Sequence, residues 1–156
     1  MCYGCAMVPL LALHVLAAVA WVGGMFFAYL VLRPAAGPLE AAVRLPLWRR
    51  VFARFFPWVW AAVALLLLSG YGMVFVGLGG FRGVGIHVHL MQATGILMML
   101  LYFHLYFAPW RRFRAAVDGG AWPEAGRQLD RIRRLVAINL ALGLLTVLVG
   151  ATGRYW

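Results

Sequence analysis

The chain has 156 residues, of which 65% are hydrophobic and 12% are charged, and its mean hydropathy is +0.90. Soluble domains are about half apolar and about a quarter charged, so these proportions exclude an ordinary soluble enzyme. The formal net charge is nevertheless +10, and all 14 cationic side chains are arginines. An apolar chain whose few charges are mostly positive indicates an integral membrane protein, not a nucleic-acid-binding protein.

Four apolar runs are long enough to cross about 30 Å of hydrocarbon, which takes about 20 helical residues. They lie at about residues 8–32, 56–76, 86–108 and 135–152, and none contains an acidic residue. A bilayer core offers the backbone no hydrogen-bond partner, so each run is predicted to be a helix. The sequence therefore predicts an all-α fold, a single domain over residues 1–156 in which four membrane-spanning helices form a bundle.

Glycines and prolines mark the expected connections. Pro34, Pro38 and Pro46 are expected to break the chain after the first run, and Pro109 to close the third. The glycine-rich residues 77–80 predict a tight link between the second and third runs. The first run lacks a basic leader and a small-residue cleavage site, so it is interpreted as an uncleaved span.

The arginines predict the orientation of the bundle. Five lie between the first and second runs and seven between the third and fourth, whereas the other side has only Arg82 and Arg154. Short arginine-rich loops remain in the cytoplasm, so both termini are expected to face outward. These segments are expected to meet anionic lipid headgroups, and they require no nucleic-acid partner.

Four histidines occur, all in or beside predicted spans. His14 and His89 are expected at a matched depth near the outer side, and His104 lies about 22 Å further inward than His89. An ionisable side chain within the membrane indicates a function, because its burial costs free energy. The alternative for His14 is a polar network with Gln92 or a water molecule.

Helical spacing adds methionine and aromatic side chains to this histidine pair. Two stripes result: His14, Ala18, Trp21 and Met25 on the first span, and His89, Gln92, Ile96, Met99 and Phe103 on the third. If the stripes face each other, they suit b-type haem ligated by His14 and His89, with Trp21 and Met99 against the ring. Arg82 and Arg154 would then neutralise the propionates. The alternative is ordinary helix packing.

The remaining candidate ligands are less specific. His87 points about 200° away from His89 around the helix, so three roles are open for it: a surface residue, a second metal ligand, or a contact for a proton or a substrate. Cys2 and Cys5, with Met7, offer soft donors for Cu(I), although a short C-x-x-C without a second half also fits an incidental chain end. No triad, paired carboxylates or phosphate loop is present, which excludes hydrolysis and phosphoryl transfer.

Five short segments of the sequence, taken together, carry a resemblance to known families. They are residues 14–24, Trp48 with Phe55-Phe56, Ser69-Gly70-Tyr71, residues 87–92, and Asn139. They resemble the short copper resistance protein D family of bacterial inner-membrane proteins. The first-span His-x6-Trp-x2-Gly is also similar to the membrane-bound, oxygen-independent protoporphyrinogen oxidase family. That resemblance implies that His14 is a haem ligand and places His89 where the family has a lysine as the partner ligand.

Three functions follow as hypotheses. The first is a haem b protein that transfers electrons at the outer leaflet, with a quinone or a periplasmic redox partner. The second is copper transport or periplasmic copper handling by the same histidines with Met25, Met91 and Cys2/Cys5. The third is an oxidase of a porphyrin precursor. The bilayer is the expected environment, and the sequence leaves the oligomeric state open.

Overall fold

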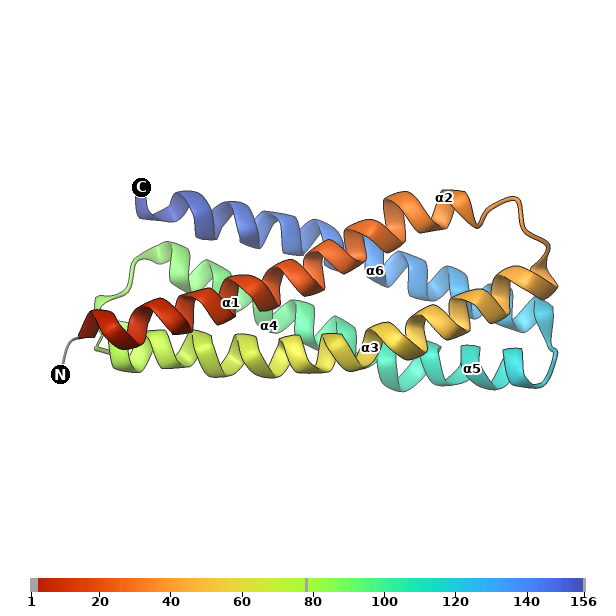
Figure 1. Cartoon of the computed structure of the whole chain (residues 1–156), viewed down its shortest axis with the longest axis horizontal. Helices are drawn as coiled ribbons and strands as arrows, with labels where there is room; N and C mark the ends of the chain where they lie inside the picture. Colours follow the sequence, from red (N-terminus) through yellow and green to blue (C-terminus); the bar gives the residue numbers. More distant parts are fainter. Residues whose placement is uncertain (1–2, 78, 156) are drawn as a thin grey trace.

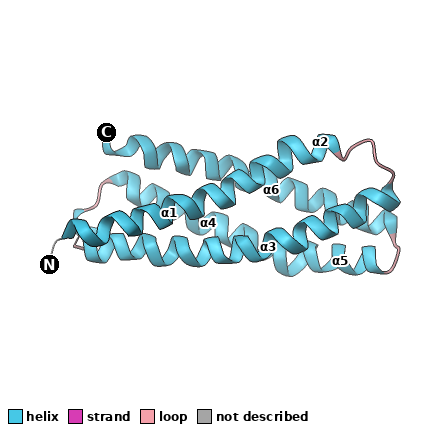
Figure 2. Cartoon of the chain, viewed as in Figure 1, coloured by secondary structure: helices cyan, strands magenta, loops and turns pink. Residues whose placement is uncertain are grey.

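The computed structural model describes residues 3–77 and 79–155, and it describes side chains for residues 7–77, 79–153 and 155. Within this part of the chain all regular structure is helical (Figure 2). The elements, in chain order, are α1 (Tyr3–Phe26), η1 (Phe27–Leu32), α2 (Arg33–Ala35), α3 (Ala41–Gly72), η2 (Met73–Gly77), η3 (Phe81–Gly83), α4 (Ile86–Leu105), η4 (Tyr106–Trp110), α5 (Arg111–Asp118), α6 (Trp122–Thr152) and η5 (Gly153–Tyr155). The all-α prediction is confirmed.

These elements join into four long helices, because η1, η2 and η4 are π-helical segments that continue the helix beside them. The long helices cover Met7–Ala35, Ala41–Gly77, Ile86–Asp118 and Trp122–Thr152, and each is long and apolar enough to cross a membrane. Every predicted span lies within one of them. The helices are longer than the predicted spans mainly on the side that carries most of the arginines.

Two of the proline predictions are wrong. Pro46 lies inside α3, and Pro109 lies inside η4, after which the helix runs on through α5. Pro46 is flanked by the buried side chains of Leu45 and Trp48, whose packing outweighs one lost backbone hydrogen bond. At Pro109 the π-helical segment changes the backbone hydrogen-bond register, a common way to accommodate a helix irregularity.

The two chain ends lie at the same end of the bundle (Figure 1). We name this the outer end, and we name the opposite end, with the α2–α3 and α5–α6 connections, the inner end. Helix α1 packs along α3, and α4 packs along α6, with fewer contacts between the two pairs. At the outer end Gly79 and Gly80 have positive φ angles of 69° and 98°, which glycine adopts readily, so the chain turns at the predicted link.

The inner half of the bundle is densely packed. An aromatic cluster of Trp48, Phe52, Phe56, Trp110 and Phe113 joins α3 to η4 and α5, with ring centroids 5.1 to 6.1 Å apart. All five side chains are buried. An ion pair between Arg49 and Asp118, at 2.7 Å, connects the same elements at their inner ends. The outer half is packed less densely, and the open volume of the molecule lies there.

Candidate functional site

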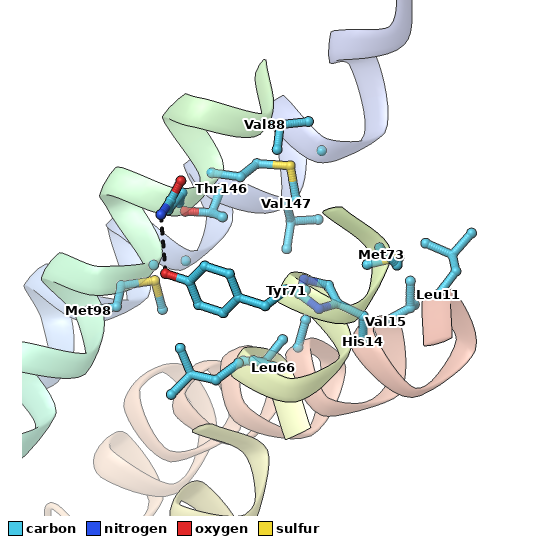
Figure 3. Close-up of a pocket in the computed structure, with 18 of the residues that line it drawn as sticks. Leu11, His14, Val15, Leu66, Tyr71, Met73, Val88, Met98, Thr146 and Val147 are labelled. Atoms are coloured by element: carbon cyan, nitrogen blue, oxygen red, sulfur yellow. Dashed lines mark hydrogen bonds between the residues drawn. The ribbon is translucent and has the colours of Figure 1, made fainter. Parts of the chain in front are cut away.

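A cavity of about 540 Å³ lies in the outer half, between the α1–α3 pair and the α4–α6 pair (Figure 3). Its walls are mostly apolar and come from all four long helices, with Phe81 of η3 at the outer end. A cavity of this size is typical of binding sites for small molecules and ions with their ligands. The residues that line it include His14, Trp21 and Met99, three of the predicted site residues.

Most of the methionines of the protein gather at this cavity. The chain has seven methionines, and five of them line the cavity: Met7, Met73, Met91, Met98 and Met99. They come from α1, η2 and α4. Thioether sulfur is a soft ligand that selects Cu(I), although methionine also fills irregular apolar space in protein interiors. The sequence predicts Met7, Met91 and Met99 as candidates but not that these five side chains line one cavity, and its fourth candidate, Met25, is not part of the described lining.

His14 is held by α3. Its Nδ1 lies 2.9 Å from the hydroxyl oxygen of Ser69, and that hydroxyl donates its hydrogen to the carbonyl of Leu65 in the preceding turn. Ser69 itself is only 2% exposed. The predicted polar network around His14 is therefore made with Ser69 and not with Gln92.

The hydrogen bond to Leu65 determines the role of the imidazole. A hydroxyl has a single hydrogen, and Ser69 uses it on the carbonyl, so the hydroxyl oxygen accepts from the Nδ1–H of His14. We infer the tautomer in which Nε2 carries a free lone pair. This is the form in which a neutral histidine ligates a metal, because an orienting partner fixes the other ring nitrogen.

His87 lines the cavity, whereas His89 does not. The ring of His89 is exposed and lies against Phe81, with the ring centroids 6.2 Å apart. His87 lies in the first turn of α4, close to Gly85 and Gly153. The two residues are separated by about 200° around the helix, so only one of them can face inward. His14 and His87 therefore line the same cavity, whereas His89 lies outside its lining.

The remaining predicted residues are distributed as follows. Trp21 is buried and packs edge-to-face on Tyr102, at 6.1 Å between ring centroids. Arg82 lies in η3 at the outer end and is exposed, and it is not part of the described cavity lining. The side chain of Arg154, Cys2 and the side chain of Cys5 lie outside the described residues. His104 is exposed on α4 near the inner end.

A tyrosine that the sequence analysis did not single out as a ligand crosses the cavity. Tyr71 of α3 extends towards α4, where the side-chain amide of Gln92 donates a 3.2 Å hydrogen bond to its hydroxyl (Figure 3). Both residues line the cavity. This bond joins the two helix pairs across the open volume, so Gln92 supports the shape of the cavity.

Glycines make room for several of the candidate ligands. A Cβ atom on Gly70 would lie 3.2 Å from the His14 ring, one on Gly85 would lie 2.7 Å from the His87 ring, and one on Gly150 would lie 2.9 Å from the Met91 methyl group. A Cβ on Gly77 would overlap the Met7 sulfur, and one on Gly143 would lie 3.1 Å from the Met98 methyl group. At five of the candidate ligands, two histidines and three methionines, the neighbouring residue is therefore a glycine, which leaves space for the side chain.

No cluster of three or more histidine, cysteine or acidic side chains exists among the described residues. The donor set at the cavity instead combines two imidazoles with five thioethers. Such a set has no carboxylate, so it is unsuited to hard cations such as Mg²⁺ and Ca²⁺, and it suits a soft ion.

Residues 49–152 match the family model of copper resistance protein D. This segment is more than half of the chain and contains two of the four long helices completely and most of a third, Ala41–Gly77. The chain belongs to the copper resistance protein D family. Together with four apolar helices of spanning length, membership makes it a multi-pass membrane protein. Comparison with curated proteins and with solved structures gives no significant match.

The family match covers the cavity residues that lie on α3, α4 and α6, but not those on α1. It includes His87, Met73 and Met91, whereas His14 on α1 lies before its first residue. The part of the predicted resemblance that concerns copper resistance protein D is confirmed. The resemblance to the protoporphyrinogen oxidase family stays a prediction, because the family match concerns copper resistance protein D.

Proposed function

We propose that the protein binds Cu(I) in the cavity of the outer half and acts in copper resistance from within the bacterial inner membrane. One observation carries the proposal: two histidines and five methionines line a single cavity that opens among apolar helices. Cu(I) prefers thioether ligands and also accepts imidazole. In this proposal the copper ion is the cargo of the protein, taken up or delivered at the outer side.

His14 and His87 are the proposed ligands on opposite helix pairs. The Nε2 lone pair of His14 follows from the Ser69 contact, and His87 faces the cavity from the first turn of α4. Met91, which reaches the backbone at Gly150, is the proposed thioether nearest to the fourth helix. A site with few ligands of this kind allows rapid exchange with an external donor or acceptor.

The test is a Cu(I) titration of the purified, full-length protein in detergent under reducing conditions, in competition with a chromogenic chelator. We expect His14→Ala and His87→Ala each to lower the Cu(I) affinity at least about tenfold, because each change removes a proposed ligand. His89→Ala is the matched control and is expected to leave the affinity unchanged, because its ring lies outside the cavity.

A second pair of variants tests the methionines with the same substitution at two sites. Met91→Leu is expected to weaken Cu(I) binding, whereas Met25→Leu is not, because Met25 is buried near the inner end and does not line the cavity. Equal affinities for both variants and the wild type would contradict the proposed site. A wild-type protein unable to compete with the chelator would contradict the proposed function as a whole.

Haem b is the second candidate, favoured by the apolar walls of a 540 Å³ cavity that two histidines line. The predicted haem residues gather only in part: His14, Trp21 and Met99 line the cavity, whereas His89 and Arg82 do not. Electron transfer with a quinone or a periplasmic partner depends on this candidate. A reduced-minus-oxidised absorption spectrum separates the two, because a haem protein shows Soret and alpha bands that a copper site does not.

A further inference from the structure

A second group of side chains lies at the inner end, away from the copper cavity. Arg33 of α2 and Arg133 of α6 line one small cavity together with Trp48 of α3, and Arg44 lies about one helical turn before Trp48. We name Arg33, Arg44 and Arg133 the arginine cluster. The guanidinium carbon of Arg33 lies 4.9 Å from the ring centroid of Tyr29. Three separate helices thus bring like charges together, which is unfavourable unless an anion joins them.

The chain supplies this cluster with only part of the negative charge it needs. Asp130 accepts a 3.0 Å hydrogen bond from Nη1 of Arg133. Arg44 instead donates from its Nη1 to the backbone carbonyls of Gly37 and Leu39, at 3.1 and 3.2 Å. Among the hydrogen bonds and ion pairs of the described residues, the three guanidinium groups of the cluster therefore share one carboxylate.

Three nitrogen atoms in this region are buried without an acceptor. They are Nε of Arg44, Nε of Arg133 and Nε1 of Trp48, none of which has a hydrogen-bond partner among the described residues. Trp48 as a whole is only 3% exposed. Nearly all buried donors in proteins are paired, because an unpaired one is costly. An acceptor from outside the chain is expected here.

A small cavity lies beside two of the residues that carry these nitrogen atoms. Arg33, Trp48 and Arg133 line a small cavity of about 30 Å³ between α1, α3 and α6. A volume of this size holds about one water-sized group. An acceptor larger than water can therefore place one oxygen in the cavity that Trp48 and Arg133 line, while the rest of it remains at the surface beside the exposed Arg33.

We propose that the arginine cluster and Trp48 bind the phosphate group of an anionic phospholipid at the inner end of the bundle. Phosphate offers several charged oxygens, which match the forked donors of arginine. The cytoplasmic leaflet, which this end is predicted to face, is the one that presents anionic headgroups. A free phosphate ion has the same recognition chemistry, and the experiment distinguishes the two sources. The proposal is independent of the copper site.

The test measures the melting temperature of the lipid-depleted, full-length protein in detergent, with three additives in separate titrations: phosphatidylglycerol, phosphatidylcholine and inorganic phosphate. We expect a melting temperature that rises and saturates with phosphatidylglycerol but not with phosphatidylcholine. A saturating rise with inorganic phosphate in place of phosphatidylglycerol would identify a free ion as the ligand of the same site.

Four variants assign the effect to these residues. Arg133→Gln and Trp48→Phe are expected to weaken the apparent lipid affinity about tenfold, because each removes one donor. Arg33→Gln tests the same site through an exposed side chain, so it remains informative if Arg133→Gln does not fold. Arg134→Gln is the control, since it removes the same charge from the exposed neighbour of Arg133.

The outcomes are decisive in either direction. Loss of the lipid effect in Arg133→Gln and Arg33→Gln, with full retention in Arg134→Gln, supports the site. The proposal is overturned if phosphatidylcholine stabilises the protein equally, if all arginine variants lose the effect equally, or if no additive changes the melting temperature. In that last outcome, water alone pairs the buried nitrogen atoms.

Discussion

His14 shows how a single residue is prepared for a function. Its Nδ1 is bound by Ser69, whose own hydrogen is committed to the Leu65 carbonyl, so the ring is left with one defined tautomer. The ring also lies beside Gly70, where a Cβ atom would come within 3.2 Å of it, so the glycine leaves the space that the ring occupies. An imidazole that is oriented before its ligand arrives loses less entropy on binding.

The first prediction concerns Ser69. Ser69→Ala removes the acceptor of the His14 Nδ1–H without adding volume, so the ring loses its fixed orientation. We expect the Cu(I) affinity of the variant to fall about tenfold, the usual effect of losing a residue that orients a metal ligand. The competition titration with a chromogenic chelator measures it.

Thr152→Ala is the control for this prediction. The Thr152 hydroxyl also donates to a carbonyl in the preceding turn of its helix, that of Leu148, but Thr152 is exposed and does not line the cavity. Equal affinity in Ser69→Ala and Thr152→Ala would show that Ser69 has no positioning role.

The sequence predicts His14 correctly as a lining residue but leaves its partner open, because hydropathy fixes depth and not helix rotation. His87 and His89 are only two residues apart, and the choice between them depends on how α4 rotates against α6. That rotation is set by close contacts such as the one between His87 and Gly153. Such contacts form only when the helices pack against each other, so the spacing of residues within one helix does not predict them.

At the scale of the elements, α6 depends on glycine where it approaches the other helices. A Cβ atom at Gly143 would lie 2.9 Å from Val22 of α1 and 3.1 Å from Met98 of α4. Val22 is branched at Cβ and has few alternative rotamers, so it cannot move aside easily. The glycine allows α1, α4 and α6 to meet at the inner boundary of the cavity.

We therefore expect Gly143→Ala to destabilise the protein by at least about 1 kcal/mol through overpacking. Gly126→Ala, in the same helix, is the matched control, because a Cβ there has no neighbour within 4 Å. It is expected to be neutral or to stabilise the helix by up to about 1 kcal/mol. Thermal unfolding in detergent, followed by circular dichroism, measures both. Opposite signs support the close approach, and two equal shifts contradict it.

The number and type of the elements follow from the sequence, whereas two helix ends do not. Apolar length predicts four helices, since lipid leaves the backbone no other arrangement. Pro46 and Pro109 mislead because local propensity treats proline as a helix end, while burial of Trp48 and the π-helical segment η4 keep the helices continuous. Packing and backbone register decide those positions.

At the scale of the whole molecule, the arginine distribution predicts that the inner end faces the cytoplasm. Twelve of the 14 arginines lie in the two segments that meet at that end. An alkaline phosphatase reporter, which is active only outside the cytoplasm, is expected to be active when fused after residue 156. The same reporter inserted in the α5–α6 connection, at Gly120, is expected to be inactive. The reverse pattern would contradict the predicted orientation.

The cavity of the outer half is closed towards the inner end. Its described lining stops there at Val22, Leu66, Met99 and Gly143, and the next layer consists of the buried side chains of Met25, Val63, Tyr102 and Leu140. In the observed conformation the described residues therefore form no conduit from one end of the bundle to the other. We expect any ligand of the cavity to enter and leave without passing through the inner half of the bundle.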